Sequence, residues 1–232
     1  MLGIIVQLAI SWLLVWLFYK ENLGVLGFLP TKKRLADFVL FFIVTAVCCA
    51  SGFLLRFIFG NEKWMINPKL NGSLILDGVW WNIKSVLFEE LIFRGVIFYI
   101  LIKKLGALKA IIISAVAFGI YHWFSFGILG DVKQMVIVFF MTGLMGLLLA
   151  YGYAKTFSLY IPSAIHLGWN FTQGFIFSSG PTGNGIFIQV KGQATVNVGY
   201  VVFFCVLLLP VMSMLLINYF LLKRRKQAIS LN

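Results

Sequence analysis

Charged residues are scarce in this chain, and acidic residues are the scarcest of them. Of its 232 residues, 11% are charged and 61% are hydrophobic, whereas a soluble domain keeps about a quarter of its residues charged. This deficit excludes an ordinary soluble domain and indicates an integral membrane protein. The 19 Lys and Arg outnumber the 7 Asp and Glu, which gives a net charge of +12. Because the basic residues lie mostly between apolar runs, we attribute them to membrane topology and to contact with anionic lipid, and we expect no nucleic-acid partner.

Cysteine is also rare, and the N-terminus lacks the features of a cleaved leader. The three cysteines, Cys48, Cys49 and Cys205, all lie in apolar runs. Their number and spacing form neither a disulfide framework nor a metal motif. Residues 1–22 contain no basic n-region and no small-residue cleavage site, so they predict a retained transmembrane helix.

Long apolar runs make up most of the chain. A membrane-spanning helix needs about 20 mostly apolar residues, and we find seven candidates, at residues 2–19, 35–59, 79–102, 108–129, 133–154, 157–178 and 199–222. Polar connectors lie at 60–78 and 179–198. We therefore expect an all-α fold, a polytopic membrane helix bundle of about seven transmembrane helices, forming one transmembrane domain over residues 1–232.

The basic residues also predict how the chain is oriented. With the N-terminus outside, the inner loops and helix ends carry Lys20, Lys32, Lys33, Arg34, Lys103, Lys104, Lys109, Lys155, Lys223, Arg224, Arg225 and Lys226. The outer side then carries only Lys63, Lys69, Lys133 and Lys191. Since cytoplasmic loops are enriched in Lys and Arg, we expect the N-terminus outside and the C-terminus in the cytoplasm. The compact loops favour a multi-pass protein of a bacterial cytoplasmic membrane.

Three charges nevertheless lie deep within the third predicted span. Glu89 is about ten residues into this helix, which places it about 15 Å deep, near the bilayer midplane. Charges at that depth are costly and usually functional. Glu90 and Arg94 are i,i+4 neighbours and can form an ion pair. Glu89 points about 100° away from Glu90, so it needs a partner on another helix.

The chain has only two histidines, and both lie within other predicted spans. His122 is in the fourth span, where it shares a helix face with Phe118. His166 is in the sixth span, where it shares a face with Asn170. Small residues at helical spacing flank these positions and would let the helices approach closely. They are Ala115, Gly119, Thr142, Gly146, Ala150, Ala164 and Gly168. The polar groups could then converge in one cavity within the bundle.

These residue types suit hydrolysis without a nucleophilic side chain. A desolvated glutamate beside a histidine can polarise a water molecule. A second histidine and an asparagine amide can donate hydrogen bonds to a developing oxyanion. Glu89, His122 and His166 could instead bind a divalent metal such as zinc. That alternative would draw its ligands from three helices and lacks a His-Glu-x-x-His element. A purely structural ion-pair cluster is the other interpretation of the charges.

Three short motifs give the chain a resemblance to a known family. EELIFR (Glu89, Glu90 and Arg94), FGIYH (Phe118 and His122) and HLGWN (His166 and Asn170) resemble the EExxxR, FxxxH and HxxxN motifs of the CPBP intramembrane proteases. This family, also called Abi, includes the type II CAAX prenyl endopeptidases and bacteriocin-immunity proteins. Each motif alone is weak, but all three occur in order, and they predict a family core over residues 79–178.

The resemblance implies an intramembrane endopeptidase that cleaves a membrane-embedded or lipidated peptide. It implies that Glu89 and His122 activate the water, that His166 and Asn170 stabilise the oxyanion, and that Glu90, Arg94 and Phe118 support them. We expect no cofactor, with zinc as the alternative. Two other functions stay open at this point: an immunity or scaffolding protein of the same fold that needs no proteolysis, and a proton-coupled transporter.

Overall fold

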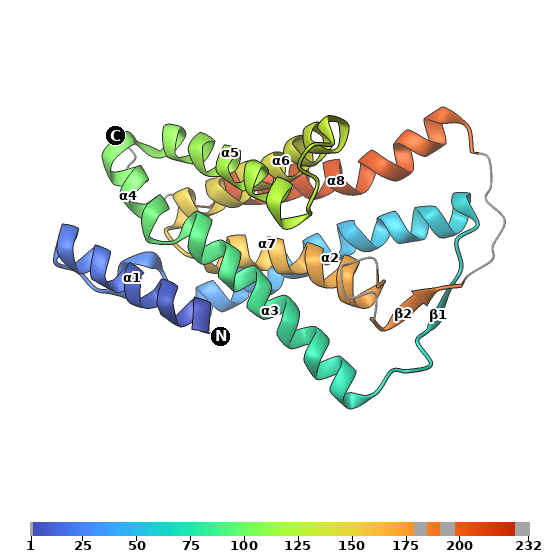
Figure 1. Ribbon diagram of the computed structural model, residues 1–232, viewed down its shortest axis with the longest axis horizontal. Coiled ribbons are helices and arrows are strands. Elements are labelled where there is room, and N and C mark those ends of the chain that lie inside the picture. Colours follow the sequence, from blue (N-terminus) through green and yellow to red (C-terminus); the bar gives the residue numbers. More distant parts are fainter. Residues whose placement is uncertain (1, 179–184, 191–197, 226–232) are drawn as a thin grey trace. The chain divides into compact units, whose positions relative to one another are not determined.

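Nearly all the regular structure consists of helices (Figure 1). The computed structural model describes the chain except for residues 1, 179–184, 191–197 and 226–232. The elements are α1 (Leu2–Tyr19), the 3₁₀ turn η1 (Leu23–Leu26), α2 (Lys32–Gly60), β1 (Trp64–Ile66), α3 (Gly72–Arg94), α4 (Val96–Leu105), α5 (Ala107–Ser125), α6 (Val132–Thr156), α7 (Tyr160–Asn170), the π-helical segment η2 (Phe171–Ile176), β2 (Phe187–Gln189) and α8 (Tyr200–Lys223).

The prediction of an all-α membrane helix bundle is confirmed. Among the described residues, five helices are long and apolar enough to cross a membrane, namely α1, α2, α5, α6 and α8. They match five of the seven predicted spans to within a few residues at most of their ends. The other two predicted spans, 79–102 and 157–178, are both interrupted.

The predicted span 79–102 is divided into α3 and α4 by a break at Gly95. A Cβ on residue 95 would lie 2.1 Å from the carbonyl oxygen of Leu91, so the backbone at the break tolerates only glycine. α3 also begins earlier than predicted, because the Asn71 side chain accepts a hydrogen bond from the Leu74 amide (2.9 Å) and caps the first turn. The polar connector predicted at 60–78 is therefore shorter, and its end belongs to a helix.

The predicted span 157–178 consists of the short helix α7 followed by η2. The Phe177 amide donates to the carbonyl of Thr172 (3.1 Å), five residues back, as the wider π turn requires. π-helical turns of this kind often occur at functional positions. The transition falls directly after Asn170, the last residue of α7.

The chain divides into two units, and each is described by itself. Unit 1 comprises residues 1–38, 87–163 and 219–232, and unit 2 comprises residues 39–86 and 164–218. The unit boundaries fall within α2, α3, α7 and α8.

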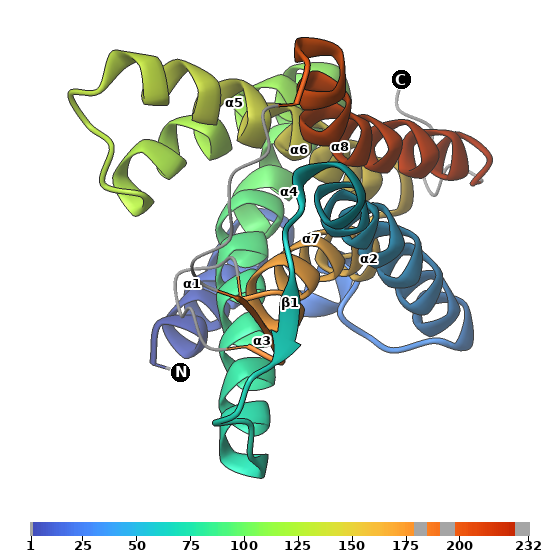
Figure 2. The same ribbon diagram turned by 90° about the vertical axis from the view of Figure 1, so that its right-hand side faces the viewer.

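In unit 1, α5 and α6 form a closely packed hairpin (Figure 2). Trp123 on α5 donates from Nε1 to the carbonyl of Met135 on α6 (2.8 Å). Gly119 makes room for the Phe139 ring, which would lie 2.7 Å from a Cβ at that position. The hairpin contributes to a core cluster of apolar side chains, in which the buried Tyr153 of α6 packs with the buried Phe98 of α4.

In unit 2, the two polar connectors meet in a short antiparallel strand pair that was not predicted. β1 pairs with β2 in the register Trp64 to Gln189 and Ile66 to Phe187. Asn67 extends the pairing, because its Nδ2 donates to the carbonyl of Gly185 (3.0 Å). The same unit packs α7 closely on α2, where a Cβ at Gly168 would lie 2.7 Å from a backbone oxygen of α2.

Candidate active site

The last turn of α3 holds a fully buried ion pair. The side chains of Glu90 and Arg94 have no exposed surface, and Arg94 Nη1 lies 3.1 Å from Glu90 Oε1. The i,i+4 pair predicted from the sequence is therefore confirmed. Removing one member of a buried pair leaves an uncompensated charge, which typically costs about 3–5 kcal/mol.

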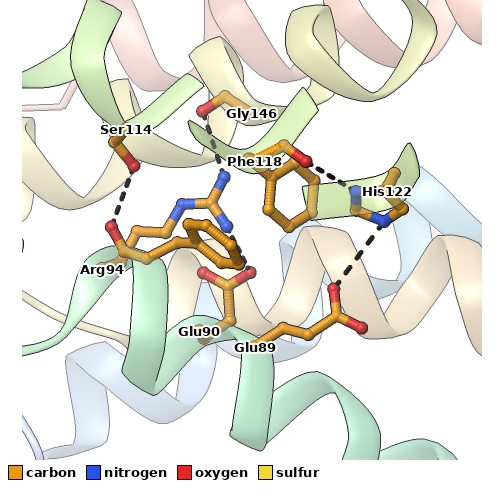
Figure 3. Close-up of polar contacts among 8 residues, drawn as sticks. Glu89, Glu90, Arg94, Ser114, Phe118, His122 and Gly146 are labelled. Carbon is orange, nitrogen blue, oxygen red and sulfur yellow. Dashed lines mark hydrogen bonds and ion pairs between the residues drawn. The ribbon is translucent and has the colours of Figure 1, made fainter. Parts of the chain in front are cut away.

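Arg94 also connects α3 to two other helices (Figure 3). Its Nη2 donates to the carbonyl of Gly146 on α6 at 3.3 Å. Its guanidinium carbon lies 4.3 Å from the centre of the Phe118 ring on α5, within the range of a cation–π interaction. The buried cation is thus surrounded by a carboxylate, a carbonyl and an aromatic face.

Glu89 faces the first histidine across the helices. Its Oε2 lies 3.9 Å from His122 Nε2 on α5, as Figure 3 shows. The Glu89 side chain keeps 13% of its surface exposed and that of His122 keeps 8%. Glu89 therefore has the interhelical partner that its position on α3 required.

The orientation of His122 is fixed from its other side. Its Nδ1 lies 2.7 Å from the carbonyl oxygen of Phe118. A carbonyl oxygen can only accept, so Nδ1 carries the proton and donates. In the neutral imidazole, Nε2 then carries the lone pair, and it is this atom that faces Glu89. Phe118 thus has two supporting contacts, its ring with Arg94 and its carbonyl with His122.

The C-terminal end of α3 is fixed by a hydrogen bond from α5. The break at Gly95 leaves the last carbonyls of α3 without partners in their own helix. Ser114 Oγ donates to one of them, the carbonyl of Phe93, at 2.9 Å. The Ser114 side chain is buried, so this contact joins α5 to the turn that carries Glu90 and Arg94.

His166 and Asn170 lie in unit 2, on α7. His166 is buried and Asn170 is half-buried at the start of η2. The predicted i,i+4 spacing holds along the regular helix. The thiol of Cys49 on α2 contacts the carbonyl of Trp169 at 3.7 Å, beside Asn170. The convergence of His166 and Asn170 with Glu89 and His122, which belong to unit 1, stays a prediction.

The zinc alternative draws its ligands from both units, since Glu89 and His122 belong to unit 1 and His166 belongs to unit 2, so it stays a prediction. Within unit 1, Glu89 and His122 offer one carboxylate and one imidazole, whereas a catalytic zinc takes three protein ligands. Over the described ranges, no group of three or more His, Cys, Asp or Glu side chains is placed to hold a metal ion. The donor set of unit 1 therefore does not fit a zinc site by itself.

Sequence reasoning missed two residues that contact the motifs, Ser114 and the Gly146 carbonyl. Ser114 stands in an apolar helix without a motif, and a single serine there has no distinctive signal. Gly146 belongs to the small-residue series on α6, which indicates close helix packing. Nothing in that series indicates that a backbone carbonyl accepts a hydrogen bond from an arginine.

The fold and this site define a class of protein: a multi-pass membrane protein with a largely buried carboxylate–imidazole pair beside a fully buried ion pair. Residues 71–172 match the family described as type II CAAX prenyl endopeptidase Rce1-like. The matched segment contains all three motifs, and this match supports assignment of that part of the chain to the CPBP (CAAX protease) family. The apolar helices and the match together support an integral membrane protein, and the match supports a protease in general. No curated protein and no solved structure matched the chain.

Proposed function

We propose that this protein is an intramembrane endopeptidase in which Glu89 and His122 activate the attacking water. The proposal rests on one observation, the 3.9 Å approach of Glu89 Oε2 to His122 Nε2. This separation is too long for a hydrogen bond between the two atoms. One water molecule can still lie about 2.8 Å from each of them, and the angle at its oxygen would then be about 90°.

Such a water would donate one proton to each acceptor. The carboxylate of Glu89 is a base, and the Nε2 lone pair of His122 is a second acceptor because Nδ1 is committed to the Phe118 carbonyl. As the water attacks the scissile carbonyl carbon, its proton passes to Glu89. The protonated carboxyl, or the imidazolium if the proton passes on to His122, then protonates the leaving amine. No covalent intermediate with the protein is needed.

The remaining motif residues have distinct roles in this proposal. His166 and Asn170 donate hydrogen bonds to the oxyanion of the tetrahedral intermediate. Glu90, Arg94 and Phe118 touch neither water nor substrate, and they hold Glu89 and His122 in place. We assign no step to a metal, and the zinc alternative with Glu89, His122 and His166 as ligands is distinguished by a chelator test.

The substrate we propose is a membrane-embedded or lipidated peptide. The active pair lies on helices whose other residues are mostly apolar, so the scissile bond must enter from within the membrane or at its surface. The family description names prenylated CAAX substrates, which would satisfy this requirement through their lipid chain. A peptide with an apolar segment would satisfy it equally.

The proposal predicts that Glu89→Gln abolishes cleavage without unfolding the protein. The amide keeps the shape of the carboxylate but cannot take a proton, so kcat should fall at least about 100-fold. Peptides that accumulate in membranes of Glu89→Gln cells, but not of wild-type cells, would identify substrates for an assay with purified protein. Glu62→Gln, which changes a partly exposed carboxylate, is the control.

Full activity of Glu89→Gln would overturn the proposal. The purified wild-type protein, treated with a metal chelator, should keep its activity. A loss of activity that added zinc restores would favour the metal-dependent alternative with Glu89, His122 and His166 as ligands.

A further inference from the structure

We propose that the backbone carbonyl of Gly146 is a positioning group of the active site and that it acts through Arg94. The inference rests on the proposed function. Gly146 lies on α6, which contains none of the three motifs. It nevertheless contacts Arg94 and lies against Phe118, the two residues that support the Glu89–His122 pair.

The first step is the electrostatic requirement of Arg94. Its side chain is fully buried, and a guanidinium has five N–H donors that must be satisfied away from water. Glu90 satisfies part of this requirement at 3.1 Å, but it belongs to the same helix and cannot fix α3 against a neighbour. The hydrogen bond from Nη2 to the Gly146 carbonyl, at 3.3 Å, joins α3 to α6.

The second step is access to that carbonyl. A helical side chain covers the surface over the turn that precedes it, so the residue that covers the Gly146 carbonyl is Ala150, four positions later. Gly146 has no side chain, and Ala150 has only a methyl group, which is fully buried. Two small residues therefore leave this carbonyl open to a guanidinium.

The third step is the contact of Gly146 with α5. A Cβ on residue 146 would lie 3.2 Å from Ala115 Cα and 3.2 Å from Phe118 Cδ1. α5 would then have to move by a few tenths of an ångström. Phe118 is the residue whose ring lies on Arg94 and whose carbonyl orients His122.

Gly146 therefore positions the pair from both sides. Through Arg94 and Glu90 it fixes the last turn of α3, which carries Glu89. Through its contact with Phe118 it fixes the position of α5 and therefore the position of His122. Arg94 also interacts electrostatically with Glu89 itself, so a displaced guanidinium would alter the field at the carboxylate as well.

The test compares two glycines on one helix. Gly146→Ala should lower kcat about tenfold and leave KM within about twofold, because small misplacements of catalytic groups slow the chemical step. Gly143→Ala is the matched control, since a Cβ at that position would meet only the Ala115 carbonyl oxygen, at 3.9 Å. It should behave like the wild type. Wild-type kcat in Gly146→Ala would overturn the inference.

A second variant addresses the carbonyl without adding bulk against α5. In Ala150→Ser, the hydroxyl can bond back to the carbonyl four residues earlier, which is the Gly146 carbonyl, and so compete with Arg94. The variant should lower kcat in the same way. It also keeps the inference testable if Gly146→Ala does not fold.

A double-mutant cycle separates positioning through Arg94 from general loosening of the bundle. Arg94→Lys loses Nη2, so Ala150→Ser, which competes only for the Gly146 carbonyl, should cost little further activity in that background. Fully additive losses would overturn the inference. The thermal unfolding midpoints of the same four proteins give a second readout of the cycle, and this readout needs no substrate. If Glu89→Gln shows that the chain is not a protease, coupled midpoints would still establish the Arg94–Gly146 contact.

Discussion

At the scale of single residues, two adjacent glutamates have opposite environments. Glu90 is fully buried against Arg94, whereas Glu89 is partly exposed and faces His122. The difference arises because successive residues of a helix point about 100° apart. One carboxylate is thereby neutralised within α3, and the other is left facing α5. We expect the two positions to respond differently to the same substitution.

Glu90→Gln should destabilise the protein, whereas Glu89→Gln should leave its stability nearly unchanged. Glu90→Gln removes the carboxylate that is hydrogen-bonded to the buried guanidinium of Arg94, and breaking a buried pair typically costs about 3–5 kcal/mol. The measurement is the thermal unfolding midpoint of each purified variant in detergent. Glu62→Gln is the control, because its pair with Arg56 is long, at 3.9 Å, and partly exposed, and such pairs contribute about 0–1 kcal/mol. Equal midpoints for the two variants would contradict the division of roles.

At the scale of elements, the sequence predicted contacts within helices better than contacts between them. The Glu90–Arg94 pair and the shared face of Phe118 and His122 follow from helix periodicity, and the structure contains both. The Ser114 and Gly146 contacts could not be predicted, because they involve backbone carbonyls of other helices. The helix break at Gly95 was equally hidden, since an isolated glycine in an apolar run is common in membrane helices.

The break at Gly95 gives a prediction about α3 and α4. Gly95→Ala should destabilise the protein, because the new Cβ would lie 2.1 Å from the Leu91 carbonyl oxygen and the turn that carries Glu90 and Arg94 would have to move. Gly72→Ala, at the other end of α3, is the control, since a Cβ there meets nothing within 4 Å. The stability of both variants is measured by their thermal unfolding midpoints and by their abundance in membranes. A Gly95→Ala variant as stable as Gly72→Ala would show that the glycine is not required.

At the scale of the whole molecule, composition predicted the five long apolar helices and missed the form of the remaining segments. Hydropathy reports how much apolar surface a segment has, and this is decisive for helices that lie largely in lipid. It reports little about the two interrupted segments, α3 with α4 and α7 with η2, although α3 and α7 carry two of the three motifs. The β1–β2 pair could not be predicted either, because its strands have three residues each and lie in connectors far apart in the sequence. The orientation of the chain stays a prediction from its basic residues.

That orientation, and the crossing of the membrane by α3 and α4 together, can be tested with one pair of substitutions. Lys69 lies before α3 and Lys103 near the end of α4, and both are exposed. The excess of basic residues predicts Lys69 outside and Lys103 in the cytoplasm. In a background without cysteine, a maleimide that cannot cross membranes should label Lys69→Cys in intact cells, and Lys103→Cys only after the cells are opened. Reversed labelling would contradict the orientation, and equal labelling of both sites in intact cells would mean that α3 and α4 do not cross the membrane. Because Glu89 lies between these two sites, the labelling also decides whether it is enclosed within the membrane, as an intramembrane protease requires.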